Sequence, residues 1–557
     1  MSSEIRNALV AFSLCFVILV GFNYLTERPA PSQNDSGASR TPPAYVNNIP
    51  LNAGTSKPLT RAEILKKTPR ISLKNTKISG SINVKGALLD DVVLTDYLET
   101  PQEKEKFIAL LNPATAAEPY FATLTWTASQ EKTPLDLPTE TTEWTRAPQS
   151  AETLEPGKDV ILTWKSPQGL TLTRTFSLDD NFMIFITDRV QNDSERDVTL
   201  EQHSRIIRSV PSQKQTSSVH EGGLVCFDAD FQEITFEKLA KGKSLSGAVS
   251  DGWVGFTDKY WLTAFIIKGT QPSTTSLSFN HHFSCQTTSV SIPLKKGDSV
   301  EYKNMFFAGA KVLKSLDAYK KQYAIKKFDL AVDFGWFYFL TKPLFLLMRL
   351  LNALWGNMAL SIVVLTLLSK GVSFPLAQSS YKSMSRMKEL QPKIDALKQR
   401  YGSDKMKVNE EMLRLYKKEK INPLSGFLPL LIQMPIFFCL YKVLAISIEM
   451  RHAPFFWIRD LSSADPTSLF NLFGLLPWTP PHFLQIGLLP LLMTGTMFLQ
   501  QKLSPQSADP AQKKMMNFLP FVFLFMFSSF PAGLVLYWTL SNSFAIGQQM
   551  WGARGKG

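Results

Sequence analysis

The placement of long apolar runs constrains this fold more than any other feature of the 557-residue sequence. Residues 7–25 form one such run, and the others fill much of the last third of the chain, at 357–377, 425–448, 484–501, 515–530 and 532–551. A helix that crosses a bilayer needs about 20 mostly apolar residues. No A-x-A-type cleavage site follows the first run, which predicts an uncleaved signal anchor over 1–25. We therefore predict a polytopic α-helical membrane protein with six transmembrane helices.

Two of the C-terminal runs are short for a bilayer. Residues 515–530 would extend about 22–24 Å as a helix, which is less than the ~30 Å thickness of the hydrocarbon core. Residues 484–501 are short too and are interrupted by Gly487, Pro490 and Gly495. Undersized helices that lie together should thin the membrane locally.

The segment between the first two apolar runs has the composition of soluble protein. Residues 26–60 are rich in Pro, Ser, Asn and Thr, which predicts a flexible tether. Residues 61–325 alternate apolar and polar side chains, as in VILTWKSPQGLTLTRTFSL around the turn at 166–169. Many short strands without intervening helical patterns favour a large antiparallel β-sandwich.

The same segment contains no convincing catalytic grouping. Cys226 and Cys285 could pair if the domain is exported, or they could remain two free thiols. His281 and His282 are neighbours that would point to opposite faces of a strand, so they do not suggest a shared ligand. We predict neither a catalytic residue nor a metal site here.

Two further segments flank the 357–377 span. In residues 332–356, Lys342 and Arg349 are seven apart on one helical face, which favours an amphipathic helix along the membrane surface with its basic side toward the headgroups. Pro343 marks a break or a helix start within it. Residues 378–424 hold twelve Lys or Arg against six Asp or Glu. Their apolar residues recur at spacings of three and four on two helices joined at 402–404, which predicts a helical hairpin. The two stripes are Met384, Met387, Leu390, Ile394, Leu397 and Tyr401, then Val408, Met412 and Leu415.

The basic hairpin also orients the chain. Cytoplasmic loops carry excess Lys and Arg, so we expect the hairpin, with Arg386, Lys388, Lys393, Lys398 and Arg400, to be cytoplasmic. Six crossings then place both termini in the cytoplasm, including the short tail 552–557, and the β-sandwich on the outer side of the membrane. The loop 451–483 faces outward, and we expect its apolar stretch LFNLFGLLPWTPPHF to be interfacial.

Lys370 lies inside the apolar stretch SIVVLTLLSKGVSFPL. A lysine near the centre of a membrane helix costs about 2.5–3.5 kcal/mol on insertion scales. Either its side chain snorkels to the headgroups, as we expect for Lys442, or its surroundings are wet. The apolar runs contain no Asp or Glu, but they do contain polar groups: Thr366, Gln433, Gln500, Gln501, Tyr537 and Trp538. A cation with neutral polar neighbours favours a wet cavity.

Four long motifs identify the family. The stretches NPLSGFLPLLIQMPIFFCLYKVL, FFWIRDLSSADP, MFLQQKLSP and FPAGLVLYWTLSN resemble the YidC family of membrane protein insertases, of the Oxa-type superfamily. The anchor, tether and sandwich match its Gram-negative members. The resemblance implies five core helices around a hydrophilic groove, with Lys370 where most members carry Arg. Thr366, Gln433 and Trp538 match other groove positions.

The resemblance also implies a function. A substrate helix would slide against Met434, Pro435 and Phe437 on one helix and against Phe521 and Phe525 on another. The chain would insert and help fold integral proteins of the bacterial inner membrane, alone or with the Sec translocon. Its partners would be nascent membrane proteins, the Sec translocon, the ribosome or signal-recognition machinery and, given the net charge of +13, anionic lipid. We expect no cofactor, no small-molecule substrate, no specific nucleic acid and no enzyme activity.

Two other functions are compatible with a polytopic chain. A membrane transporter or channel would usually show repeated halves or paired ionisable groups across the membrane. An assembly scaffold would act through its periplasmic domain.

Overall fold

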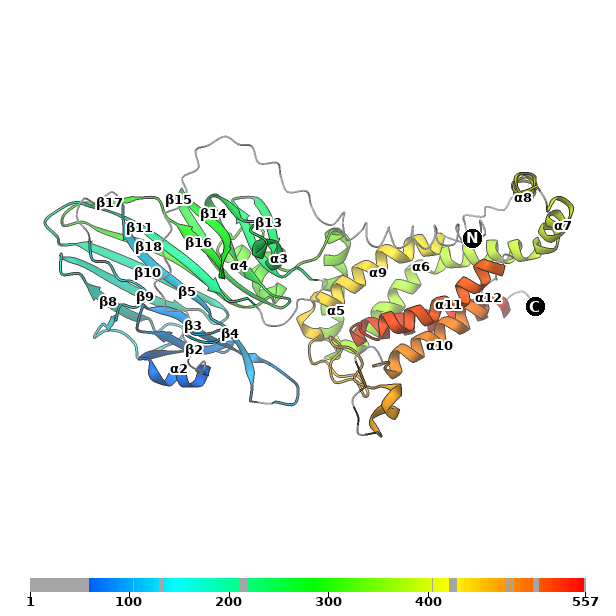
Figure 1. The fold of residues 1–557 in the computed structure, drawn as a ribbon, viewed down its shortest axis with the longest axis horizontal. Helices are drawn as coiled ribbons and strands as arrows, with labels where there is room; N and C mark the ends of the chain where they lie inside the picture. The colour runs from blue at the N-terminus through cyan, green and yellow to red at the C-terminus, as the bar shows by residue number, and fades with distance from the viewer. Residues whose placement is uncertain are drawn as a thin grey trace. The chain divides into compact units, whose positions relative to one another are not determined.

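A computed structural model describes residues 60–554, apart from 104, 130–134, 211–218, 403, 420–427, 477, 479, 482–484 and 504–509 (Figure 1). The predicted signal anchor and nearly all of the tether lie outside the described residues. The described chain divides into two compact units, and the boundary along the sequence lies between Asp333 and Phe334.

The first unit is built from strands. Within its described residues these are β1 (Arg70–Lys74), β2 (Ile78–Asn83), β3 (Leu88–Leu98), β4 (Phe107–Leu111), β5 (Tyr120–Ala128), β6 (Thr145–Arg146), β7 (Thr153–Leu154), β8 (Val160–Lys165), β9 (Leu170–Leu178), β10 (Met183–Asn192), β11 (Val198–Arg208), β12 (Gly222–Phe227), β13 (Asp230–Thr235), β14 (Leu245–Thr257), β15 (Trp261–Asn280), β16 (His282–Thr288), β17 (Ile292–Leu294) and β18 (Ser299–Ala310). Short helices accompany them: α2 (Arg61–Lys67), α3 (Phe236–Ala240), α4 (Leu313–Gln322) and the 3-10 turn η1 (Phe328–Ala331).

The strands form two layers that share β15. One layer runs through β8, β9, β10, β18, β15 and β14, and the other through β5, β11 and β16. The first part of β15 pairs with β18, and its last part pairs with β16. The pairing is antiparallel apart from β1 beside β7. The structure confirms the predicted β-sandwich and its hairpin around 166–169, where Gly169 adopts a positive φ of 95°.

The histidines and cysteines of this unit are now placed. His281 has a φ of 60° and forms the turn between β15 and β16, so the prediction that His281 and His282 share a strand was wrong. Cys226 and Cys285 are buried free thiols on β12 and β16, so the pairing alternative does not hold. Burial raises the pKa of Cys226 to about 11 and also raises the pKa of Cys285, which makes both poor nucleophiles.

The sandwich unit extends past the predicted end at 325, because η1 packs on it as α4 does. The Tyr319 hydroxyl accepts from the Phe182 amide at 2.9 Å and donates to Asp179 at 2.5 Å. The Phe328 ring lies 5.3 Å from the Trp253 ring and 5.4 Å from the Phe307 ring. These contacts bury residues that the alternating pattern did not include.

The second unit is helical. Its described elements are α5 (Tyr338–Trp355), α6 (Met358–Glu389), α7 (Gln391–Tyr401), α8 (Lys405–Lys418), α9 (Leu428–Ile446), η3 (Ile448–Met450), η4 (Leu469–Gly474), α10 (Leu488–Leu503), α11 (Pro510–Phe527) and α12 (Ala532–Arg554). Helix α6 packs against α5, α9 and α12, and α10 packs against α11 and α12.

Helix α5 differs from the predicted interfacial helix in two ways. It starts at Tyr338 and continues through Pro343, so the prediction of a break or start at that proline was wrong. Its exposed stripe is apolar, and the basic side chains flank it: Lys342 donates to the Tyr338 hydroxyl, and Arg349 lies 3.4 Å from Glu449. The stripe consists of Phe339, Leu346, Leu350 and Leu354.

Helix α6 runs without a break from the predicted span into the predicted hairpin. It ends at Glu389, so the first helix of the hairpin is divided between α6 and α7. Pro392 explains the division, because it has no amide hydrogen for the preceding helical turn. The turn at 402–404 leads into α8, where the Asp404 side chain accepts from the amides of Met406 and Lys407. Leu390, Ile394 and Val408 are buried.

The last three helices also shift from their predicted bounds. Pro490 lies in the first turn of α10, where proline is tolerated, and Gly495 does not interrupt the helix. Helix α11 begins at Pro510, five residues before the predicted run. The five added residues include Lys513 and Lys514, so the apolar part of the helix is no longer than the predicted run.

Length and hydropathy single out one span among the described residues. Met358–Pro375 in α6 is long and apolar enough to cross a membrane. The apolar stretches Pro435–Ile446 in α9 and Met516–Phe527 in α11 are shorter. The six transmembrane helices stay a prediction.

Candidate functional site

Lys370 lies on a polar stripe of α6. Thr366, one turn earlier, is fully buried and its hydroxyl donates to the Ile362 carbonyl at 2.7 Å. The Ser369 hydroxyl donates to the Thr366 carbonyl at 2.9 Å, and the Ser373 hydroxyl to the Ser369 carbonyl at 3.0 Å. The hydroxyl hydrogens are thus satisfied within the helix, which leaves oxygen lone pairs as the groups that this stripe presents. Lys370 itself is half-buried.

Trp538 lies in an aromatic cluster that joins three helices. Its ring is 4.7 Å from the Phe437 ring of α9 and 5.1 Å from the Phe527 ring of α11. The Phe523 ring is 6.0 Å away, and Tyr441 and Phe530 extend the cluster, with their rings 6.1 Å apart. The structure therefore gives Trp538 a packing role that its prediction as a groove polar group did not include.

The predicted contact face of α11 is divided. Phe521 and Phe525 are exposed, at 48% and 56%, whereas Phe523 and Phe527 turn toward Trp538. Residues two apart on a helix lie about 200° apart, so the two pairs occupy opposite faces. Phe523 and Phe527 are the α11 residues that contact Trp538, which in turn contacts Phe437 of α9. The sequence shows a run of phenylalanines and does not distinguish this pair from the exposed pair.

The other predicted groove residues are spread over the bundle. Tyr537 is buried and Gln500 is half-buried. Pro435 and Phe437 are half-buried on α9, while the side chains of Gln433 and Met434 lie outside the described part of the structure. Polar contacts that the sequence did not predict tie α10 to its neighbours: Asn542 donates to Thr496 at 3.3 Å, and Gln501 donates to Asn517 at 3.4 Å.

The hairpin keeps most of its described basic side chains exposed. Arg386 and Arg400 are exposed, and Lys393 pairs with Glu419 at 2.8 Å, which links α7 to α8. The side chains of Lys388 and Lys398 lie outside the described residues.

The sandwich unit contains a buried polar network that the sequence analysis missed. Arg174 occupies an inward position of β9 and binds Asp188 through two hydrogen bonds of 2.7 Å. Asp188 also accepts from Trp126 at 2.8 Å and from Gln202 at 3.1 Å. A basic residue in phase with the buried positions of a strand was the signal that could have revealed it.

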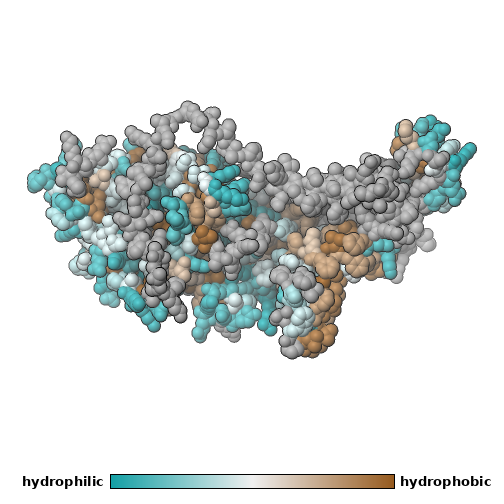
Figure 2. Space-filling model, viewed as in Figure 1, coloured by the Kyte–Doolittle hydropathy of each residue, from teal (hydrophilic) through white to brown (hydrophobic). Residues whose placement is uncertain are grey.

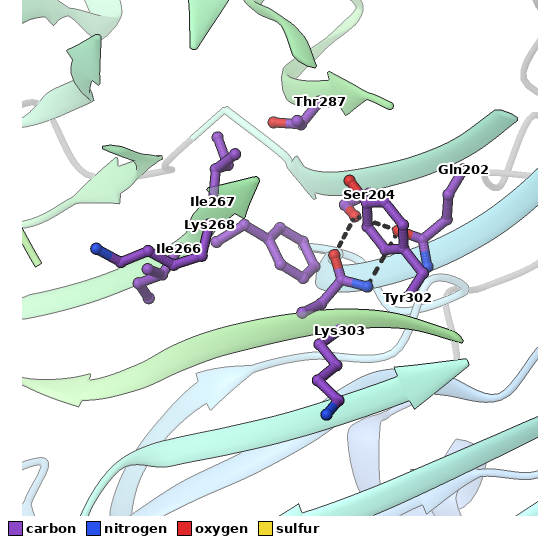
Figure 3. Close-up of a pocket in the computed structure, with 10 residues that line it drawn as sticks. Gln202, Ser204, Ile266, Ile267, Lys268, Thr287, Tyr302 and Lys303 are labelled. Carbon is purple, nitrogen blue, oxygen red and sulfur yellow. Dashed lines mark hydrogen bonds between the residues drawn. The ribbon is translucent and has the colours of Figure 1, made fainter. Parts of the chain in front are cut away.

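A small pocket adjoins this network (Figure 3). Gln202, Ser204 and Asn304 hydrogen-bond to one another along its wall. Its volume of about 10 Å³ has room for roughly one water molecule. The pocket therefore does not suggest a substrate site.

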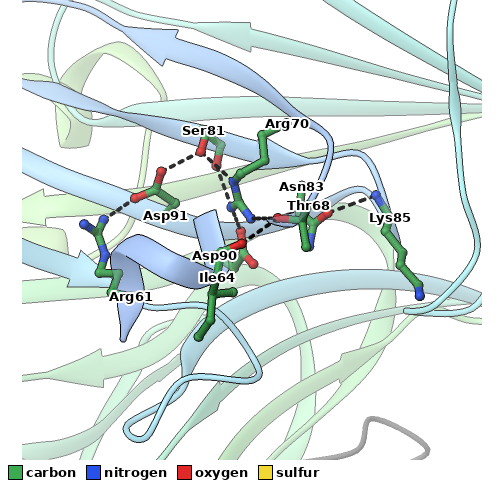
Figure 4. A network of polar contacts seen from close by, with 9 residues as sticks. All are labelled: Arg61, Ile64, Thr68, Arg70, Ser81, Asn83, Lys85, Asp90 and Asp91. Atoms are coloured by element: carbon green, nitrogen blue, oxygen red, sulfur yellow. Dashed lines mark hydrogen bonds and ion pairs between the residues drawn. The ribbon is translucent and has the colours of Figure 1, made fainter. Parts of the chain in front are cut away.

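A second network fixes the start of the sandwich unit (Figure 4). Arg61 pairs with Asp91, and Arg70 pairs with Asp90. Ser81 connects them, because it donates to Asp91 at 2.5 Å and accepts from Arg70 at 2.7 Å. Burial raises the pKa of Asp90, while Arg70 acts in the opposite direction. The Arg61–Asp91 pair holds α2 against β3, and the Arg70–Asp90 pair joins β1 to β3.

Comparisons with known proteins decide the family. Residues 70–347 match the YidC periplasmic domain, and residues 350–556 match the 60Kd inner membrane protein family. The chain is 38% identical over 561 residues to the membrane protein insertase YidC of Rickettsia conorii, with 99% of each protein covered. It is 40% identical over 586 residues to that of Beijerinckia indica, covering 99% of this chain and 96% of the relative.

The chain belongs to the YidC family of membrane protein insertases. It is accordingly an inner-membrane protein whose β-sandwich unit is the YidC periplasmic domain. The recognition from sequence motifs is confirmed, and the relatives are named as insertases rather than as enzymes.

Solved structures add likenesses of low score. A crystal structure of an active YidC insertase with its first transmembrane domain resolved has a TM-score of 0.35 and 16% identity, and the match covers 86% of this chain and 94% of that chain. A galactose mutarotase related enzyme from Lactobacillus acidophilus has a TM-score of 0.30 and 10% identity, and covers 43% of this chain and 97% of its own. The family assignment rests on the sequence matches.

Proposed function

We propose that this chain inserts nascent integral membrane proteins into the inner membrane and helps them fold, through a hydrophilic groove that carries one cation. The observation that carries the proposal is Lys370, a half-buried lysine within the apolar span Met358–Pro375. The apolar runs that form α9 to α12 contain neutral polar side chains and no Asp or Glu. A lysine within an apolar span, among neutral polar side chains, suits a wet surface that attracts a passing negative charge.

The polar stripe of α6 supports the groove. The half-buried Ser369 and Ser373 present hydroxyl oxygens beside Lys370, and such oxygens can accept from water or from the ammonium group. We place Thr366, which is buried one turn earlier, at the floor of the groove. We place Gln433, Gln500, Tyr537 and Trp538 along the same groove. Trp538 would form its apolar wall, because its ring packs against Phe437 and Phe527.

The apolar part of a client would slide along α9 and α11. We assign Met434, Pro435 and Phe437 to this slide, together with the exposed Phe521 and Phe525. Burying apolar surface of the client yields about 25 cal/mol per Å², which supplies the driving force without a nucleotide. Local thinning would shorten the path of the client's polar segment.

The topology follows the positive-inside rule. We propose six transmembrane helices, with both termini and the α7–α8 hairpin in the cytoplasm. The exposed Arg386 and Arg400 suit contact with the ribosome, signal-recognition machinery or anionic lipid. Insertion would proceed alone or with the Sec translocon.

The mechanism begins with electrostatic capture. A short acidic outer segment of the client enters the groove from the cytoplasm and is attracted by Lys370. Two unit charges about 4 Å apart attract by roughly 4 kcal/mol at an effective dielectric constant of about 20. The apolar helix of the client then moves along the slide into lipid, which pulls the captured segment across.

Charge variants of Lys370 test this proposal. We expect Lys370→Arg to insert a small Sec-independent client into proteoliposomes as the parent does, because the charge is kept. Lys370→Ala and Lys370→Glu should reduce insertion about tenfold or more, since losing about 1.4 kcal/mol of attraction is enough for a tenfold effect. Insertion is measured by protease protection of the client at matched protein levels.

Lys442→Ala is the matched control, because Lys442 lies in α9 and its aliphatic stem packs near Gly335. It should insert the client at the parental rate. If Lys370→Ala and Lys370→Glu insert as well as the parent, Lys370 is a snorkelling side chain and the groove cation carries no function.

A transporter or channel and a periplasmic scaffold are the alternatives to an insertase. Membership of an insertase family favours insertion over transport. The scaffold alternative makes the periplasmic domain essential, which a deletion can test.

A further inference from the structure

Large apolar side chains gather on the loop between α9 and α10. Figure 2 shows hydrophobic residues concentrated where Figure 1 draws this loop. We call the described residues of 455–457 and 469–478 the apolar tip. Phe456 is 84% exposed and Leu475 is 83% exposed. The other exposed members are Trp457, Leu469, Phe470, Leu472, Phe473, Leu476 and Trp478.

The tip lacks the charges of a surface that faces water. The sequence has no Asp, Glu, Lys or Arg from Pro466 to Gln501, whereas charged residues make up 19% of the chain. Exposed apolar patches of this kind mark contact with a membrane or another protein. A protein interface would usually add a polar rim and about one hydrogen bond per 100–200 Å². Here the Trp478 indole N–H is used within the loop, because it donates to the Phe470 carbonyl rather than to a partner protein. This favours lipid as the contact of the tip.

The two acidic residues near the tip are turned inward. Asp460 accepts from the His452 amide at 3.0 Å and from the Ser462 amide at 2.8 Å. Asp465 is buried and accepts from the Leu489 amide at 2.8 Å. The carboxylates therefore organise the base of the loop and leave apolar side chains at its surface.

Three exposed apolar residues of the tip have a strained backbone. Phe456, Leu472 and Phe473 have positive φ angles of 48°, 50° and 58°. For residues with a side chain the left-handed conformation is unfavourable, and bulky residues rarely adopt it. Strained residues of this kind cluster at functional contacts.

The base of the tip lies at one end of the apolar span of α6. The Gly533 amide donates to the Leu461 carbonyl at 2.9 Å, and the Ala532 amide donates to the Ser463 carbonyl at 2.7 Å. Gly533 in turn abuts Ile362, near the start of the span Met358–Pro375. The tip thus emerges at the level where α6 leaves the hydrocarbon core.

We propose that the apolar tip inserts into the periplasmic leaflet of the inner membrane and anchors the outer end of the helical unit in lipid. The inference rests on α6 crossing the membrane, and it does not depend on the groove or on Lys370. Aromatic side chains such as Trp457 and Trp478 suit the interfacial depth, and interfacial apolar faces bury about 5–10 Å into the bilayer.

Spin labels at the tip test the proposal. Leu475→Cys and Phe456→Cys are labelled one at a time in the full chain and reconstituted into phosphatidylcholine–phosphatidylglycerol vesicles. The described native cysteines are buried, and the parent treated with the same spin label measures any background labelling. Power saturation compares access of oxygen, which concentrates in lipid, with access of a water-soluble nickel chelate. We expect the oxygen-to-nickel access ratio to exceed one at both tip positions.

Lys241→Cys is the matched control, because Lys241 is an exposed residue of the sandwich unit, with 70% of its side chain accessible. Its label should give a ratio below one. Tip labels with the ratio of Lys241→Cys would mean that the tip lies in water. Tip labels reached by neither reagent would mean that protein covers it, a second copy or a partner. Either result overturns the lipid anchor. Parental insertion by the Lys370 variants would overturn the groove cation but not the anchor, because the anchor does not depend on Lys370.

Discussion

At the scale of single residues, Arg174 shows how the sandwich accommodates charge. Strand β9 alternates buried and half-buried residues, and Arg174 takes a buried position between Leu172 and Phe176. Its guanidinium stacks 5.0 Å from the centre of the Trp144 ring and pairs with Asp188. Taking two charges out of water costs more than the pair returns unless further groups bind them. Trp126 and Gln202 complete the shell of Asp188, and Arg174 donates to the Leu124 carbonyl at 3.0 Å, although its Nη1 has no hydrogen-bond partner among the described residues.

Arg174→Met should therefore destabilise the sandwich strongly. The variant leaves a buried carboxylate without its cation, which costs about 3–5 kcal/mol. Hydrogen exchange of the β9 and β10 amides in the full chain measures the free energy of opening. Arg189→Met is the control: Arg189 is exposed on β10, and its loss should cost about 0.5 kcal/mol or less. Equal losses in the two variants would contradict the role of the buried pair.

His203 gives the sandwich a predictable pH dependence. Burial lowers the pKa of His203 below its ordinary 6.5, and Arg205 lowers it further, while Glu201 and Glu140 act in the opposite direction. The neutral ring hydrogen-bonds with Thr127 at 2.7 Å and Thr288 at 3.0 Å. The unfolded chain binds the proton more readily, so stability is complete above pH 6.5 and falls as the pH drops through the folded pKa.

His203→Gln should flatten this dependence. The amide can bind both threonines but does not titrate, so the loss of stability between pH 6.5 and the folded pKa should be smaller than in the parent. The difference in unfolding free energy between parent and variant can change by at most about 1.4 kcal/mol per pH unit, because one group titrates. Hydrogen exchange of β5 and β11, corrected for the intrinsic rate, measures it. Because burial also lowers the pKa of His220, a residual slope is expected, but an unchanged slope would exclude His203.

At the scale of elements, Trp538 links α9, α11 and α12 through its ring. Trp538→Phe should keep most of the packing and most of the insertion activity. Trp538→Ala should destabilise the bundle by about 2–3 kcal/mol, below the usual cost of truncating an aromatic residue in a core, because Trp538 is half-buried. Thermal unfolding in detergent and client insertion are measured on the same preparations. If Trp538→Phe loses insertion as fully as Trp538→Ala while it stays folded, the indole N–H acts as a polar group of the groove.

The elements also show what a sequence can reveal and what it cannot. Alternation located the β8–β9 hairpin, and hydropathy located the apolar parts of α6, α9, α10, α11 and α12, because both signals are local. The facing of Phe523 and Phe527 toward Trp538 depends on contacts between helices, which a pattern of phenylalanines does not encode. The same holds for Arg174, whose burial depends on a partner on another strand.

At the scale of the whole molecule, the boundary between the two units matters most. The predicted sandwich ended at 325, but η1 buries Phe328 against it, and Asp333 accepts from the His220 amide at 2.8 Å. Helix α4, inside the predicted bounds, buries Leu313 and Leu316. Helical patterns near a boundary do not reveal which side they pack on. A deletion that ends at residue 310 would leave these apolar faces exposed on the part that remains.

Deletion of residues 61–333 should therefore separate an insertase from a periplasmic scaffold. The variant joins Thr60 to Phe334 and removes the sandwich together with α4 and η1. If the helical unit performs insertion, this variant should insert a Sec-independent client within about twofold of the parent, since a few tenths of a kcal/mol covers that difference. Deletion of 62–310 serves as the control and should accumulate less protein, because exposed apolar helices favour aggregation and degradation. A folded 61–333 deletion that inserts nothing would transfer the activity to the periplasmic domain and support the scaffold.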